Sequence, residues 1–219
     1  SRLDWQRLAY DNGTSLSYDW DPAGLADWSL VTSFFDAQSR LDWQQIVRDN
    51  GAWILNGGEG SNELNGGVGD DTLDGGASDD ILRGGFGNDS ISGGVGNDTI
   101  SGNAGSDTVN GGAGNDSFIF NSPLGSNNDD LILSYNAFED TILLDQSVFG
   151  AIGAAGSPLA AGSFTVNSVA TSTDHRIVFD NATGALFYDA DGSGAGSAVH
   201  FATLTGISGS ITYAEFLII

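Results

Sequence analysis

The sequence has 219 residues, with 29 acidic and 6 basic side chains and a formal net charge of −23. A surface of this charge repels nucleic acid phosphates and anionic membranes and attracts cations. The absence of Cys excludes disulfides and thiolate metal sites, and no run of about 18 apolar residues predicts a membrane-spanning helix.

Residues 1–55 contain a repeat that predicts β-hairpins. The hexapeptide SRLDWQ occurs at residues 1–6 and 39–44, and DNG follows each copy, at residues 11–13 and 49–51. Asn-Gly beside alternating apolar residues is a hairpin signal. We expect Trp5, Trp28 and Trp43 to be core residues, with a carbohydrate- or partner-binding surface as the alternative. The sequence lacks Met and begins within a repeat, so we expect more copies upstream in a longer protein.

Residues 57–119 divide into seven nonapeptides without an insertion: GGEGSNELN, GGVGDDTLD, GGASDDILR, GGFGNDSIS, GGVGNDTIS, GNAGSDTVN and GGAGNDSFI. Position 8 is apolar in every copy, and position 6 is Asp in every copy except the first, which has Asn62. A fixed period of this kind is typical of a stacked solenoid. The alternative is a Gly- and Asp-rich disordered linker, or a solenoid without metal, but the unbroken apolar position argues against disorder.

The nonapeptide pattern predicts a short strand followed by a turn. Positions 7–9 alternate polar and apolar, so we expect a strand with position 8 facing inward. Positions 1–6 then form the turn, which glycine at positions 1, 2 and 4 permits. Stacked position-6 carboxylates about 5 Å apart repel one another by roughly 1 kcal/mol per neighbour even in water. Calcium, which takes six or more oxygen ligands, would neutralise this charge and satisfy the turn carbonyls.

In tandem, GGxGxDxUx resembles the RTX repeats, whose fold is a calcium-binding parallel β-roll. The resemblance implies two nonapeptides per coil and about five calcium ions, each between two stacked turns. One turn supplies the carbonyls of positions 2 and 4 with its Asp, and the other supplies the carbonyls of positions 1 and 3 with its Asp. The implied groups are Gly58, Gly60 and Asn62 with Gly75, Ala77 and Asp80; Gly67, Gly69 and Asp71 with Gly84, Phe86 and Asp89; Gly76, Ser78 and Asp80 with Gly93, Val95 and Asp98; Gly85, Gly87 and Asp89 with Gly102, Ala104 and Asp107; and Gly94, Gly96 and Asp98 with Gly111, Ala113 and Asp116.

Three positions depart from the repeat pattern. Asn62 replaces the first Asp, so the site that it would share with Asp80 loses a charge and should be weak. Ser78 and Asn103 replace glycines. A side chain need not abolish a carbonyl ligand, and Asn tolerates the left-handed backbone region better than Ser.

Residues 120–219 predict an antiparallel β cap over the open end of the roll. Strands are expected at DDLILSY, DTILLD, HRIVFD, GALFYDA and AVHFATL, with turns at DNATG and DADGSG. The segment NDDLILSYNAFEDTILL resembles the one that follows the roll in serralysin-type proteases and in alginate epimerase modules. The loop from Asp189 to Gly194 reads as an acidic hairpin turn, and the alternative is one more calcium site near Asp189 and Asp191.

The last residues, YAEFLII, resemble the C-terminal export signal of type I secretion substrates, with an ordinary last strand as the alternative. No charged-then-apolar leader opens the sequence. Together with the RTX-like repeats, this resemblance implies a secreted, extracellular bacterial protein that contacts the type I secretion machinery.

The sequence carries no recognisable catalytic motif. It has no HExxH and no GxSxG, and its only histidines are His175 and His200. We therefore expect a non-catalytic, all-β chain with hairpins at 1–55, a calcium-bound parallel β-roll at 56–119 and a cap at 120–219. Two functions stay open: a secretion and folding module behind an upstream enzyme, or the end of a large repetitive surface or adhesion protein.

Overall fold

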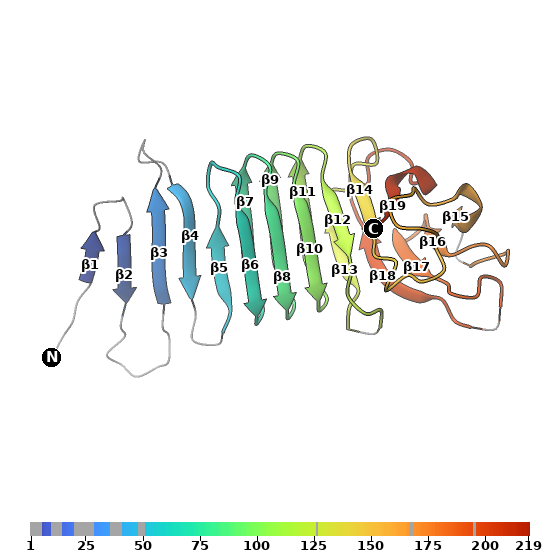
Figure 1. The fold of residues 1–219 in the computed structure, drawn as a ribbon, viewed down its shortest axis with the longest axis horizontal. Coiled ribbons are helices and arrows are strands. Elements are labelled where there is room, and N and C mark those ends of the chain that lie inside the picture. Colours follow the sequence, from blue (N-terminus) through green and yellow to red (C-terminus); the bar gives the residue numbers. More distant parts are fainter. Residues whose placement is uncertain are drawn as a thin grey trace.

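The computed structural model describes residues 6–9, 15–19, 29–35, 41–47, 51–125, 127–166, 169–194 and 196–219, with side chains from residue 51 onward. These residues form an all-β chain in which two largely parallel sheets stack as a β-roll (Figure 1). No helix in this described part is long and apolar enough to cross a membrane.

The roll is built from strands that alternate between the two sheets along the chain. The first sheet holds β5 (Trp53–Asn56), β7 (Thr72–Ala77), β9 (Ser90–Val95), β11 (Thr108–Ala113) and β13 (Asp130–Leu133). The second sheet holds β6 (Glu63–Val68), β8 (Ile81–Phe86), β10 (Thr99–Ala104), β12 (Ser117–Phe120), β14 (Thr141–Leu144) and β19 (Phe216–Ile218). Each nonapeptide strand pairs in parallel with the strand two further on, so that Leu73 lies opposite Ile91. Two nonapeptides therefore make one coil, as the resemblance implied.

The strands are longer than the sequence predicted. We expected positions 1–6 to turn, but β7 runs TLDGGA and includes positions 1–3 of the next nonapeptide. Gly76 pairs across the sheet with Gly94, and a Cβ at Gly76 would lie 2.1 Å from the carbonyl oxygen of Gly58. Glycine at position 2 thus permits the backbones of adjacent coils to approach closely and also permits a positive φ. The turn is therefore limited to positions 4–6.

The core of the roll is a stack of position-8 side chains, as predicted. Their exposed fractions lie between 0% and 6% for Leu64, Leu73, Leu82, Ile91, Ile100, Val109 and Phe118. Flanking side chains at positions 7 and 9 are mostly exposed or half-buried, which matches the period-two alternation of a strand. This stack continues into the C-terminal part through Ile132 and Ile142, which are 1% and 0% exposed.

The N-terminal strands are antiparallel and extend the first sheet. They are β1 (Gln6–Ala9), β2 (Ser15–Asp19), β3 (Ser29–Phe35) and β4 (Leu41–Val47). The pairs β1–β2 and β4–β5 are antiparallel and flank the two DNG segments, as predicted for hairpins. Trp5 and Trp28 lie outside the described residues, and so does the side chain of Trp43, so their role stays a prediction.

The C-terminal part is only partly the antiparallel cap that we predicted. β13 and β14 stack in parallel on β11 and β12, and β18 (Val199–Leu204) and β19 stack in parallel on β13 and β14. The antiparallel segment is the small set β16 (Ile177–Asp180), β17 (Ala185–Tyr188) and β18, with β15 (Phe164–Val166) parallel to β16. Two 3-10 helices lie at Ala161–Ser163 and Tyr213–Glu215. The continuing aliphatic stack explains why the roll geometry extends past the nonapeptides.

Buried aromatic rings fill the end of the roll. Phe149 and Phe201 are 0% and 1% exposed and contact each other edge to face with ring centroids 5.2 Å apart. Phe118, the last position-8 side chain, packs on Tyr135 at 5.8 Å. This packing covers the apolar end that a solenoid would otherwise expose to water.

Candidate metal centre

One carboxylate oxygen of each position-6 Asp is held by the main chain of the turn stacked on its N-terminal side. The Oδ1 atoms accept N–H groups in the pairs Trp53–Asp71 (2.6 Å), Asn62–Asp80 (2.7 Å), Asp71–Asp89 (2.7 Å), Asp80–Asp98 (2.9 Å), Asp89–Asp107 (2.7 Å) and Asp98–Asp116 (3.0 Å). These bonds fix the side chains as two aspartate ladders along the roll. Residues 71, 89 and 107 belong to one ladder, and residues 80, 98 and 116 belong to the other.

The second carboxylate oxygen of each ladder Asp has no partner. The Oδ2 atoms of Asp71, Asp80, Asp89, Asp98, Asp107 and Asp116 are buried and lack a hydrogen bond within the described residues. The six side chains are only 1% to 3% exposed. A buried carboxylate oxygen without a donor is costly, so these rows require a positive partner.

The unpartnered oxygens of Asp71, Asp80, Asp89 and Asp98 each lie near a backbone carbonyl of the next coil. A Cβ placed on Gly66 would lie 2.3 Å from Asp71 Oδ2 and 2.5 Å from the carbonyl oxygen of Gly84. The same holds at Gly93, where the distances are 2.3 Å to Asp98 Oδ2 and 2.4 Å to the Gly111 oxygen. Glycine at position 1 therefore leaves a cradle lined by oxygens from two turns, which suits a hard cation.

Burial raises the pKa of every ladder Asp. For Asp89, the pKa rises from its ordinary value of 3.8 to about 7. Desolvation is the largest cause, the negative charges of Asp107 and Asp71 add to it, and a hydrogen bond from the Asp71 N–H opposes it. Without a cation, the ladders would therefore hold protons at a pH at which an unfolded chain would not.

This shift predicts how pH acts on the chain in a chelator. The folded-state pKa of the ladder Asp residues lies above the unfolded value, so their contribution to stability is present at low pH and lost as pH rises toward about 7. We expect more β structure by far-UV circular dichroism in chelator at about pH 5 than at about pH 7.5. In calcium the order should reverse, because protons compete with the ion. An equal signal at both pH values in chelator would contradict this prediction.

Of the predicted carbonyl ligands, those of positions 1–3 lie at the ends of strands and those of position 4 lie in the turns. The position-1 residues Gly84, Gly93, Gly102 and Gly111 lie next to the unpartnered carboxylate of the preceding coil. Carbonyls at positions 2 and 3 also accept ladder hydrogen bonds, as in Ala77 N to Gly58 O (2.7 Å) and Gly69 N to Phe86 O (2.8 Å). A carbonyl has two lone pairs, so each could still bind an ion.

The predicted side-chain departures are tolerated by the backbone. Ser78 and Asn103 adopt φ values of 79° and 67°, in the region that glycine occupies in the other copies. No three acidic or His side chains converge on one point among the described residues. Any ion in the ladders would therefore depend on main-chain carbonyls as much as on carboxylates.

Asn62 differs from the ladder Asp residues because its amide can satisfy its own turn. With the nitrogen oriented toward the carbonyls, the amide donates to Gly57 O (2.8 Å) and Gly60 O (2.9 Å). Gly60 is one of the predicted ligands of the first site. A neutral donor in this place is consistent with the weak first site that the sequence predicted.

We expect Asn62→Asp to strengthen this first site. The substitution replaces a neutral amide with a carboxylate beside the Gly75 carbonyl and the Asp80 ladder. Calorimetric titration should show one more calcium ion per chain, or a lower calcium concentration at the folding midpoint. Asn181→Asp, an equal charge change at an exposed turn, is the control. If both variants bind calcium like the unmodified chain, the account of this site is wrong.

Sequence reasoning missed a second, exposed ladder at position 5. Asp70 Oδ1 accepts the Asn88 N–H (2.8 Å), and Asn88 Oδ1 accepts the Ser106 N–H (2.9 Å). Asp79, Asn97 and Asn115 repeat the arrangement on the other edge. The enrichment of Asp and Asn at position 5 of the nonapeptides was the available signal.

Sequence reasoning also missed two Asp residues that prolong the ladders beyond the nonapeptides. Asp130 Oδ1 accepts the Asp107 N–H (3.1 Å), and Asp140 Oδ1 accepts the Asp116 N–H (3.2 Å). Burial raises the pKa of Asp130 to about 8. Each residue lies two positions before a buried Ile, as position 6 lies two positions before the buried position 8. Spacings of 23 and 24 residues from the preceding ladder Asp hide both from a search with the 18-residue coil period.

The loop from Asp189 to Gly194 holds an exposed carboxylate, Asp191, that accepts a backbone hydrogen bond. Asp191 Oδ2 accepts the Gly196 N–H at 3.0 Å. This hydrogen bond lowers the pKa of Asp191, and the nearby Arg176 guanidinium lowers it further. The hydrogen bond to Gly196 is compatible with an acidic turn, and one more calcium site near Asp189 and Asp191 stays a prediction.

Comparison with known proteins identifies the repeat region. A family model for the RTX calcium-binding nonapeptide repeat (4 copies) matches residues 56–91 and 83–118. Among solved structures, the solution structure of the AlgE6R3 subunit from the Azotobacter vinelandii mannuronan C5-epimerase is 28% identical over 67% of this chain and 71% of that one, with a TM-score of 0.31. No curated protein matches the chain.

Proposed function

Residues 56–118 of this chain are RTX calcium-binding nonapeptide repeats, and from this premise we propose that the chain folds on calcium outside the cell and supports the export and folding of a larger protein. The observation that carries the proposal is the row of six buried, unpartnered carboxylate oxygens, four of which face a carbonyl of the next coil. RTX repeats are typical of secreted bacterial proteins, and RTX modules are typically non-catalytic.

We assign the calcium ligands to pairs of stacked turns. In each pair the earlier turn supplies its Asp with the carbonyls of positions 2 and 4, and the later turn supplies the carbonyls of positions 1 and 3 with its Asp. Four pairs carry two Asp residues each, and the pair with Asn62 carries one. The convergence of Asp71 Oδ2 and the Gly84 carbonyl supports this assignment.

Calcium would then act as a folding switch. In the cell, where calcium is scarce, repulsion between the ladder carboxylates keeps the repeats unfolded and able to pass through an exporter. Outside, millimolar calcium matches the roughly 10⁻⁴–10⁻³ M affinities of extracellular calcium modules. Because the ions bind the folded chain and not the unfolded one, binding free energy becomes folding free energy. Stacked sites share turns, so folding should be cooperative.

The C-terminus supports export of an unfolded chain. Phe216 and Ile218 of the expected signal are 0% and 1% exposed in β19, so a receptor could read them only before folding. Replacing residues 213–219 with polar residues should reduce the fraction of chain found outside a host that carries a type I exporter. Undiminished export of that variant would sink this part of the proposal.

The identity of the larger protein separates two versions of this function. An upstream catalytic motif would make the chain a secretion and folding module of an enzyme, whereas many upstream LDW and DNG copies would place it at the end of a repetitive surface protein. The antiparallel strands β1–β4 join the same sheet as the roll, and the sequence of this N-terminal region contains two such copies. The division into units 1–55, 56–119 and 120–219 stays a prediction.

Calcium binding itself is tested by counting ions. Native mass spectrometry of the full chain in calcium should show several ions bound cooperatively, with few intermediate states. Magnesium, which prefers strict octahedral geometry and retains its waters, should bind poorly at the same concentration. Failure to bind calcium at millimolar concentration would overturn the proposed function.

A further inference from the structure

Asp107 has a carboxylate oxygen that the nonapeptide repeats leave unmatched. Within the repeats, the Oδ2 of each earlier Asp faces the position-1 carbonyl of the next coil, as Asp89 faces Gly102. No further nonapeptide follows Asp107 in its ladder. Yet Asp107 is 1% exposed, and its Oδ2 is buried without a hydrogen-bond partner among the described residues. The Asp107 Oδ2 would lie 2.0 Å from a Cβ built on Gly102. The other ladder Oδ2 atoms lie similarly close to a Cβ built on the position-1 glycine of their own nonapeptide.

The turn that stacks on Asp107 comes from outside the repeats. Residues 125–133, GSNNDDLIL, keep Gly at position 1, Asp at position 6 and an apolar residue at position 8. Val109 of β11 lies opposite Ile132 of β13, and Asp130 Oδ1 accepts the Asp107 N–H. Gly105 N donates to Asn128 Oδ1 at 2.9 Å, which ties the two turns together a second time. The ladder geometry of the repeats is therefore reproduced here.

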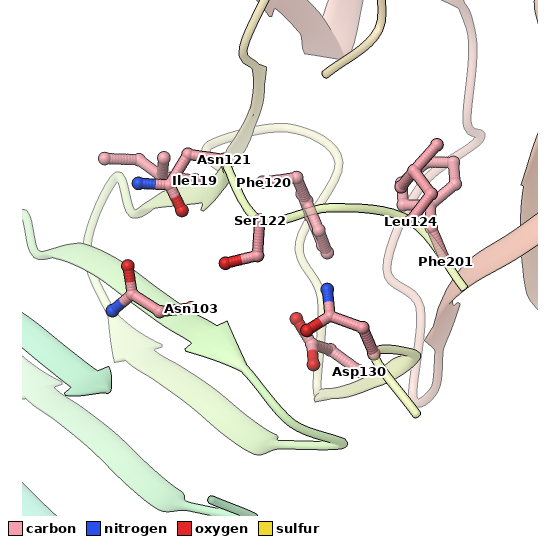
Figure 2. A pocket seen from close by; sticks show the side chains of 9 residues that line it. Asn103, Ile119, Phe120, Asn121, Ser122, Leu124, Asp130 and Phe201 are labelled. Carbon is pink, nitrogen blue, oxygen red and sulfur yellow. The ribbon is translucent and has the colours of Figure 1, made fainter. Parts of the chain in front are cut away.

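A small cavity of about 10 Å³ adjoins the second of these turns, where it is lined by Asn128 and Asp130, by residues that follow β12 and by Asn103 of β10. Its polar lining consists of Asn103, Asn121, Ser122, Asn128 and Asp130. Figure 2 shows Asp130 and Ser122 facing the same hollow, with Asn103 on the neighbouring strand. Asp130 is 6% exposed, and its only hydrogen bond among the described residues uses Oδ1, so its second oxygen is free to bind. The volume corresponds to about one water-sized sphere.

We propose that a calcium ion binds between Asp107 and Asp130, at the junction of the roll and the C-terminal segment. The ion would take one oxygen from each buried carboxylate and complete its shell with main-chain carbonyl oxygens of the two stacked turns, on the side where Asp130 also lines the cavity. This all-oxygen set, with no Cys or His lining the cavity, fits a hard divalent cation. The inference rests on the proposed function, because it uses the same calcium-driven folding.

The ladder of Asp80, Asp98 and Asp116 ends differently. The proposed junction site is therefore specific to the ladder that contains Asp107. Asp140 stacks on Asp116 in the same way, but both of its carboxylate oxygens accept hydrogen bonds. Its Oδ2 accepts the Asn136 N–H at 2.8 Å, so the second oxygen is satisfied by its own turn. Of the two ladder ends in the described part of the chain, the one at Asp107 and Asp130 keeps an unpartnered oxygen on both carboxylates, whereas the other keeps one on Asp116 alone. An ion there would link folding of the repeats to docking of the C-terminal segment.

The test compares Asp130→Asn with Asp129→Asn in the full chain. D130N keeps the oxygen that accepts the Asp107 N–H and removes the charge. D129N makes the same charge change one residue away, on a side chain that is 42% exposed and 3.5 Å from His200. Native mass spectrometry in calcium should show one ion fewer in D130N and no change in D129N. An unchanged count in D130N, or an equal loss in both variants, would overturn the proposal.

A measurement on the unmodified chain covers the case in which D130N does not fold. Crystals grown in calcium should show an anomalous scattering peak between Asp107 and Asp130, besides peaks between Asp71 and Asp89 and along the ladders. Ladder peaks without a junction peak would overturn this inference and leave the proposed function standing. The absence of every peak would overturn both.

Discussion

Replacing Gly93 with alanine is expected to remove one calcium ion and to raise the calcium concentration at the folding midpoint several-fold. The new Cβ would lie 2.3 Å from Asp98 Oδ2 and 2.4 Å from the carbonyl oxygen of Gly111. It would therefore fill the cradle between two turns and force main chain to move. Overpacking of this kind costs about 1–3 kcal/mol, and the lost ion adds to it. Circular dichroism during a calcium titration measures the midpoint, and native mass spectrometry counts the ions.

The effect at Gly93 should arise from contact rather than from backbone strain. Gly93 lies outside the positive φ region, so alanine can adopt its backbone conformation. Gly150→Ala is the matched control, because Gly150 also lies outside that region and a Cβ there meets open space. A G93A variant that binds and folds like G150A would show that the cradle holds no ion.

Deleting residues 120–219 is expected to leave the nonapeptides unfolded even in millimolar calcium. The deletion removes β13 and β14, which pair with the last repeat strands, and exposes Val109 and Phe118. It also removes Asp130 and Asp140, whose carboxylates accept the N–H groups of the last two ladder residues. In this account the C-terminal segment is the nucleus from which the roll grows. The calcium-dependent gain of β signal should disappear.

A deletion at the other end provides the control. Removing residues 1–47 takes away β1–β4, which contact the roll through the pairing of β4 with β5. This deletion leaves both aspartate ladders intact. That variant should keep its calcium transition. If the chain of residues 1–119 kept a calcium transition of full amplitude per repeat, the nucleus hypothesis would be wrong.

The sequence was most informative where its period is strict. The apolar position 8 and the acidic position 6 predicted the buried stack and the ladders, because every copy offers the same environment. The extent of the strands was harder to predict, since glycine at positions 1 and 2 is compatible with a turn or with closely paired strands. Gly76 lies in a paired strand, where its backbone approaches Gly58 more closely than a Cβ would allow.

The C-terminal continuation of the roll was hidden by irregular spacing. Residues 120–124 separate the last nonapeptide from GSNNDDLIL, and ten residues instead of nine separate Asp130 from Asp140. These insertions break the nine-residue frame, whereas the buried Ile132 and Ile142 keep the coil in three dimensions. Pairing across coils depends on packing and main-chain hydrogen bonds, which a period counted along the sequence does not contain.

The central claim is that calcium drives the roll to fold, and a calcium titration followed by far-UV circular dichroism tests it most directly. The full chain should begin in chelator with little β signal and gain it cooperatively as calcium approaches millimolar concentration. Magnesium at the same concentrations should produce little change. A chain that is already folded in chelator at neutral pH, with no response to calcium, would mean that the aliphatic stack alone holds the roll, and would contradict the account.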